Sequence, residues 1–113
     1  QTAVVAGWMP SYLQQMHHHF RHHTWMVYIP TMLEFLDVPD VATLAAPKPL
    51  MVLNCERDGL YPMESMRAAD EKIGAVYQRL DAGDRYRCNY YDEPHSLTIE
   101  MQEDAFAWLN LWL

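Results

Sequence analysis

The sequence predicts an α/β protein with three layers, in which a parallel sheet of about three strands is covered by helices on both faces. Short apolar runs of the kind found in buried strands alternate with segments of helical periodicity. Strands that alternate with helices need crossover connections, and these produce a parallel sheet. The chain has 113 residues, half of them hydrophobic, which is enough for one small packed core.

Three runs are predicted to be strands. Ala3 to Ala6 is apolar throughout and is closed by Gly7, which is typical of a strand buried on both faces. Leu50 to Leu53 follows a proline, which is tolerated at the start of a strand. Tyr86 to Tyr91 has one more polar face, which places it nearer an edge of the sheet.

Helical periodicity is clearest over Glu64 to Leu80 and again over Glu100 to Leu113. The stretch between the first two strands is less regular. We expect one helix there from Ser11 to about His23 and a short helical segment from Val38 to Leu44.

The net charge of −7 excludes some partners. An acidic chain without a basic cluster is a poor candidate for binding nucleic acid or an anionic membrane surface. No apolar run is long enough to cross a bilayer. The chain begins with Gln1 and enters a strand-like run at once, without a signal sequence, so we expect residues 1–113 to be a portion of a single domain. Cytoplasmic and secreted locations both remain open.

An acid and a histidine follow two of the predicted strands. Asp58 comes just after the second strand and His95 just after the third. Functional side chains in open α/β sheets lie beyond the carboxyl ends of the strands, so the two loops should be neighbours. A carboxylate that accepts the Nδ1–H of a histidine leaves Nε2 as a general base. The alternative is that Asp58 belongs to a simple turn and His95 to a helix start.

Several segments resemble the C-terminal part of α/β-hydrolases, most closely the dienelactone hydrolase-like and acetyl xylan esterase-like group. These segments are VVAGWM (4–9), HTWM (23–26), APKPLMV (46–52), ERDGLYP (56–62), YDEPH (91–95) and AFAWL (105–109). The resemblance implies the C-terminal part of an α/β-hydrolase fold, with Asp58 as the catalytic acid and His95 as the catalytic base. It also implies that His23 and Trp25 help to line a substrate pocket, and it implies no cofactor.

The chain departs from this family at the nucleophile. Such enzymes carry a serine in a G-x-S-x-G turn upstream of the acid, and none of Ser11, Ser65 and Ser96 has that surrounding. Cys55 and Cys88 also lie outside such a turn. We therefore expect a fragment of a carboxylic-ester hydrolase that is inactive by itself, and that associates with another copy or a missing upstream half through its first strand.

A histidine cluster offers an alternative function. His18 and His22, like His19 and His23, are four residues apart and would share one face of a helix, where they could hold a metal ion. The cluster lacks the glutamate of a zinc protease motif and a third ligand at helical spacing, so a solvated helix face is the simpler interpretation and we assign no metal. The alternative class is therefore a non-catalytic module that binds metal or a partner.

Two pairs of bulky residues allow two interpretations. Trp8 and Met9, and Trp25 and Met26, indicate either an apolar substrate pocket or ordinary core packing. We include Trp8, Met9 and Trp25 among the candidate pocket residues.

Overall fold

The computed structural model describes residues 1–18, 20–23 and 28–113, with the side chains of residues 17, 18 and 20 left aside. The order of its elements is β1 (Ala3–Ala6), α1 (Tyr12–His18), η1 (Phe20–His22), η3 (Met32–Glu34), α2 (Val38–Thr43), β2 (Leu50–Cys55), α3 (Met63–Arg79), η4 (Gly83–Arg85), β3 (Tyr86–Tyr91) and α4 (Ile99–Trp112).

The strands form one parallel sheet in the order β1-β2-β3. Val52 in the middle of β2 pairs with Val5 on one side and with Cys88 on the other. All six residues of β2 are buried, which explains why that strand is apolar over most of its length. The predicted α/β class and the position of β3 at an edge are confirmed.

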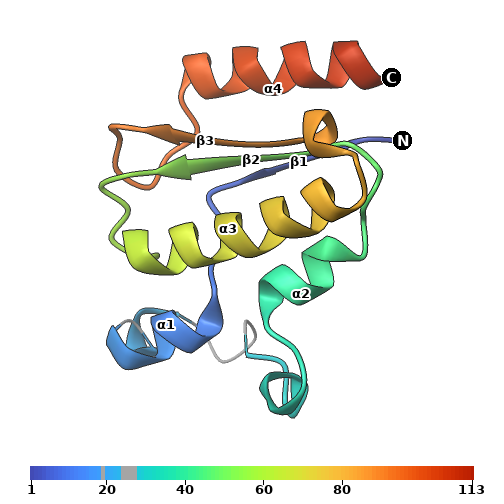
Figure 1. Cartoon of the computed structure of the whole chain (residues 1–113). Coiled ribbons are helices and arrows are strands. Elements are labelled where there is room, and N and C mark those ends of the chain that lie inside the picture. Colours follow the sequence, from blue (N-terminus) through green and yellow to red (C-terminus); the bar gives the residue numbers. More distant parts are fainter. Residues whose placement is uncertain (19, 24–27) are drawn as a thin grey trace.

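Helices cover both faces of the sheet, and Figure 1 shows α3 and α4 on opposite sides of it. On one face, Ala69, Ile73 and Tyr77 of α3 pack with Leu50 and Val52. On the other, Met101 and Trp108 of α4 pack with Met51, Leu53 and Cys55. The two side-chain sets of β2 therefore belong to two separate cores, as expected for alternating residues of a central strand.

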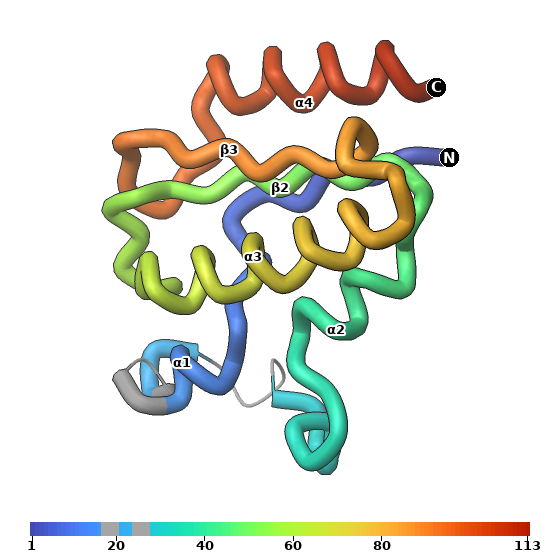
Figure 2. The backbone as a smooth tube through the Cα atoms, in the orientation of Figure 1, coloured from blue at the N-terminus to red at the C-terminus, as the bar shows by residue number. Residues whose placement is uncertain are grey.

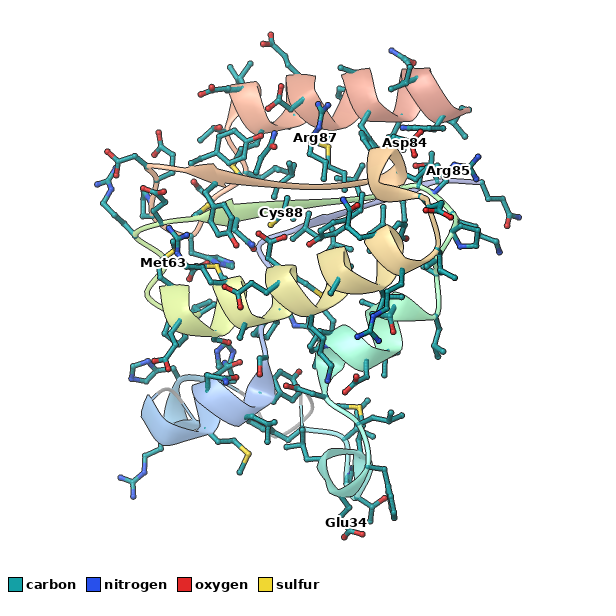
Figure 3. The ribbon with its side chains drawn as sticks, in the orientation of Figure 1. Glu34, Met63, Asp84, Arg85, Arg87 and Cys88 are labelled. Atoms are coloured by element: carbon teal, nitrogen blue, oxygen red, sulfur yellow. The ribbon has the colours of Figure 1, made fainter. Side chains whose placement is uncertain are left out.

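Neighbouring residues of β3 show the same division. Arg87 and Cys88, both labelled in Figure 3, point to opposite sides of the sheet. The Arg87 guanidinium lies 5.5 Å from the ring centre of Trp108 in α4, while Cys88 packs against the core under α3.

Two predictions about the first part of the chain are wrong. Strand β1 is not buried on both faces: Ala3 and Ala6 are exposed, because within the described part of the chain β1 pairs only with β2. The expected helix from Ser11 to His23 is also too long. Helix α1 ends at His18 and a short 3₁₀ turn follows, so His18 and His22 do not lie on one continuous helix.

The described residues between β1 and β2, which include α1 and α2, form a lower part of the molecule next to α3 (Figure 2). It is joined to α3 by hydrogen bonds between buried groups: the Ser65 hydroxyl donates to the Ser11 carbonyl at 2.8 Å, and the Ser11 amide donates to the Ser65 carbonyl. No helix among the described residues is long and apolar enough to cross a membrane.

Candidate active site

Asp58 is held in a tight turn after β2. One carboxyl oxygen, Oδ1, accepts the backbone N–H of Leu60 at 2.8 Å and that of Tyr61 at 3.3 Å. This is the local bonding that makes aspartate common in turns. The side chain is fully buried, so its second oxygen points in a direction fixed by the backbone.

His95 lies on the loop after β3 and meets that second oxygen. Its Nδ1 is 2.8 Å from Asp58 Oδ2, although the two residues are 37 positions apart. The His95 side chain is 44% exposed. When Nδ1 carries the proton and donates to Asp58, Nε2 is left to accept a proton from elsewhere. The predicted meeting of Asp58 and His95 is confirmed.

The two loops are bonded directly to each other. The Glu56 N–H donates to the Tyr91 carbonyl at 2.8 Å, and the Arg57 N–H donates to the Glu93 carbonyl at 3.1 Å. The Arg57 side chain forms an ion pair with Asp92 at 2.7 Å. These bonds continue the β2–β3 pairing beyond the strands, so the loops keep a fixed separation.

Gly7 brings the end of β1 against the imidazole of His95. Its φ of +59° lies in the left-handed region that favours glycine. A Cβ atom at this position would lie 3.2 Å from Cε1 of His95 and 3.9 Å from Nε2. The three strands of the sheet therefore each contribute a segment to the site.

Tyr61, at the end of the turn that holds Asp58 (the acid turn), packs between His23 and His95. Its ring stacks on His23, with 4.7 Å between ring centres, and lies 6.1 Å from the ring of His95. Nε2 of His23 is 2.8 Å from the Leu60 carbonyl. Burial, followed by the nearby Tyr12 and Asp58, raises the pKa of Tyr61 to about 12, so this phenol stays neutral at physiological pH.

The predicted pocket residues separate into three groups. Trp8 and Met9 line an apolar cavity together, and Met9 also belongs to the buried core. His23 does not line that cavity but contacts the acid turn through Leu60 and Tyr61. Trp25 lies outside the described residues.

The serines and cysteines of this chain do not supply a nucleophile to His95. Ser96, the nearest serine in sequence, donates instead to the Pro94 carbonyl at 2.8 Å. Ser11 and Ser65 are both buried, and Ser65 belongs to α3. Burial, with the nearby Asp70, raises the pKa of the Cys88 thiol to about 12, so it is not a thiolate. Cys55 is buried beneath the His95 loop, where its thiol donates to the Ser96 carbonyl.

The structure describes part of the histidine cluster. Among the described residues, no group of three or more His, Cys, Asp or Glu side chains could hold a metal ion. His19 and the side chains of His17 and His18 lie outside the described part. Because α1 ends at His18 and Phe20–His22 is a 3₁₀ turn, the backbone does not place His18 and His22 on one α-helix.

Sequence reasoning placed Gly7 in a loop at the end of the first strand but missed its contact with His95, and it missed Tyr61 as part of the site. A glycine directly after a strand is a signal for a close approach, but it does not say which residue approaches. Tyr61 has no sequence signal, since its position depends on three loops meeting.

Comparison with known proteins relates the chain to hydrolases. No protein-family model matches it. A Bacillus subtilis (strain 168) protein named "Putative hydrolase YtaP" is 28% identical over 91 residues. The match covers 80% of this chain and 30% of that protein, so the chain spans less than a third of the length of this relative.

Among solved structures, the fold is similar to that of the Pyrococcus furiosus esterase Pf2001. The TM-score is 0.63 at 20% identity, and the likeness covers 96% of this chain and 43% of the esterase. A second crystal form of the same esterase gives a TM-score of 0.59 at 21% identity. At this level of identity the likeness shows the fold alone: the chain folds like part of an esterase.

Proposed function

We propose that this chain is the acid-and-base part of a serine hydrolase that cleaves carboxylic esters. The observation that carries the proposal is the 2.8 Å contact between His95 Nδ1 and a fully buried Asp58, at the carboxyl end of a parallel sheet. The similarity to a protein named a hydrolase and to the fold of an esterase supports it. From the sequence motifs, we further propose the dienelactone hydrolase-like or acetyl xylan esterase-like group.

In this proposal Asp58 keeps the proton of His95 on Nδ1. Nε2 then takes the proton of a serine hydroxyl as that oxygen attacks the ester carbonyl, and passes it to the leaving alcohol. Asp58 stabilises the imidazolium that forms between these two steps. Its Oδ1 is held by two backbone N–H groups, so Oδ2 does not have to reorient during the reaction.

The proposal predicts that this chain alone has no esterase activity, because neither G-x-S-x-G nor an equivalent cysteine turn is present. Hydrolysis of p-nitrophenyl acetate should equal that of a variant with His95→Ala. Saturable hydrolysis with a burst, removed by a serine-directed phosphonate, would contradict this prediction.

The state of His95 can be tested without the nucleophile. The ¹⁵N chemical shifts of its imidazole at alkaline pH should show the proton on Nδ1. In Asp58→Ala, which removes the acceptor, the proton should move mainly to Nε2, as in a free imidazole. Asp92→Ala is the matched control, because Asp92 is an exposed carboxyl on the same rim that contacts Arg57 instead. An Nε2–H tautomer in the unsubstituted chain would overturn the proposed role of Asp58.

We also propose that the chain self-associates through β1. Alternate residues of a parallel strand donate to the same neighbour; Ala3 and Gly7 donate to the β2 side, so the Ala6 N–H faces away from β2. Ala6→Pro should therefore reduce association, and Ala6→Thr, which keeps the N–H, should not. Size-exclusion chromatography with light scattering checks this. A monomeric unsubstituted chain at high concentration would refute it.

A further inference from the structure

An apolar cavity lies between the end of β1, η3 and α2. It is lined by aromatic and aliphatic side chains, among them Trp8, Met9, Tyr12, Met32, Val38 and Ala42. Met9, Tyr12 and Val38 are buried, whereas Trp8 is 43% exposed and forms part of the rim. The cavity is therefore reachable from solvent although its inner wall belongs to the core.

The cavity lining starts one residue after Gly7, the glycine that contacts His95. Gly7 is in contact distance of the imidazole, and the next two residues along the chain are cavity residues. Consecutive Cα atoms are about 3.8 Å apart, so the backbone of Met9 is within about 8 Å of that of Gly7. An ester held at Nε2 of His95 could place one of its two substituents along this stretch.

The size of the cavity sets the size of its occupant. Its volume is about 180 Å³. An apolar cavity of about 150 Å³ in another protein stays dry and binds benzene. Six carbon atoms, as a ring or a short chain, therefore suit the space here.

The lining disfavours water as the permanent occupant. A buried water needs two to four polar partners, and Tyr12 carries the one hydroxyl among these side chains. That hydroxyl is itself buried without a hydrogen-bond partner among the described residues, and burial, followed by Tyr28 and Asp37, raises its pKa to about 12. A neutral and largely apolar surface, linked through Trp8 to the glycine that contacts His95, is suited to an apolar group of a substrate.

We propose that this cavity binds an apolar substituent of the ester, of about six carbon atoms. The role as a substrate site rests on the proposed function, whereas the binding of a six-carbon apolar group does not. The reaction therefore takes place at His95 while the cavity selects among esters by the size of this group.

Straight-chain alcohols test the proposal, because they are neutral and the chain carries a net charge of −7. The chain is labelled with ¹³C on its methionine methyl groups, and 1-butanol, 1-pentanol, 1-hexanol and 1-octanol are titrated in turn. Met9 and Met32 line the cavity and should shift with saturation, while Met101, in the core on the other face of the sheet, should not.

Affinity should rise about fourfold for each added methylene up to hexanol, which corresponds to the transfer of one methylene from water, and then level off. Absence of saturable shifts at Met9 and Met32, or equal shifts at Met101, would overturn the proposal. Affinity that keeps rising at the same rate to octanol would indicate an open surface and would also overturn it.

Ala42→Phe should fill the cavity and abolish the shifts at Met9 and Met32. Leu44→Phe adds a ring near the same helix at a position that is 80% exposed and outside the cavity, and should leave binding intact. If circular dichroism shows that Ala42→Phe does not fold, Val41→Phe replaces it, because Val41 lines the cavity and is 45% exposed. Binding that survives a folded filling variant would contradict the proposal. The tautomer of His95 is measured separately, so the two proposals can fail independently.

Discussion

Two buried aspartates of this molecule have nearly the same hydrogen bonds and different chemistry. At the start of α2, Oδ1 of Asp37 accepts the N–H groups of Tyr12 at 2.8 Å and Val38 at 2.7 Å, and Oδ2 accepts the Ser11 hydroxyl at 2.5 Å. On the rim of the sheet, Asp58 also receives two backbone N–H groups on one oxygen and one side chain on the other.

The difference lies in the third partner. Ser11 is buried, and its hydroxyl has no second basic atom to offer to a substrate. His95 is partly exposed and has Nε2 on the far side of its ring. A buried, hydrogen-bonded aspartate is therefore not sufficient to identify an active site. The deciding feature is whether its side-chain partner exposes a basic atom to solvent. Asp37 orders the segment between β1 and β2, while Asp58 orients a base.

The largest expected effects come from replacing each of the two aspartates by alanine in turn. Asp37→Ala removes a helix cap and leaves buried donors unpaired, so the free energy of unfolding should fall by about 3 kcal/mol with no change in the tautomer of His95. Asp58→Ala should cost about 2 kcal/mol and should move the His95 proton. Urea denaturation and ¹⁵N shifts measure the two effects. A change of tautomer in Asp37→Ala would show that the two regions are coupled.

Gly7→Ala should alter the surroundings of the Asp58–His95 pair and leave the hydrogen bonds of Asp37 unchanged. The left-handed backbone costs about 1 kcal/mol for alanine, and the added Cβ would press on the His95 ring. We expect that loss of stability together with a weaker preference for the Nδ1–H tautomer. Gly59→Ala is the control, because a Cβ there would meet no atom within 4 Å. Equal effects of the two substitutions would argue against a specific contact.

The smallest expected effect on stability comes from the ion pair between Asp40 and Lys72 next to Asp37, and it depends on pH. Asp40 completes the α2 cap by accepting the Asp37 N–H and pairs with Lys72 at 2.6 Å. The hydrogen bond from Lys72, with that N–H second, lowers the pKa of Asp40 below 3.8. A lowered folded-state pKa adds stability above pH 3.8 that is lost as the pH falls through the lowered value.

Lys72→Gln should therefore cost about 0.5 kcal/mol at pH 7, a small value because the pair is partly exposed, and this cost should vanish in acid. Urea denaturation at a series of pH values measures it. Lys48→Gln removes the same charge from a residue that forms no ion pair within the described part of the chain. A cost for Lys72→Gln that persists below the folded pKa would rule out the ion pair as its cause.

Sequence patterns were informative where periodicity and topology act together. The bounds of β1 and β3 follow from local patterns of apolar and polar residues, and Asp58 and His95 could be paired because the ends of parallel strands share one edge. The described residues between β1 and β2 form short helices and turns, held in part by the hydrogen bonds of Asp37. Such short elements leave no clear hydrophobic periodicity in the sequence. Only Trp8 and Met9 of the cavity lining were predicted from the sequence. Val38 and Ala42 join them through tertiary packing, which the sequence does not reveal.

The site joins residues from all three strand ends, and this has a consequence for folding. Asp58 and His95 cannot meet until β2 and β3 are paired in register, and Gly7 reaches the imidazole only once β1 has joined β2. The backbone hydrogen bonds of α3 join residues close in sequence, whereas the site needs contacts between residues far apart in the chain, which are slower to form. The final tautomer and ring environment of the His95 imidazole therefore appear only after β1, β2 and β3 have all paired. The imidazole is a spectroscopic reporter of the completed sheet.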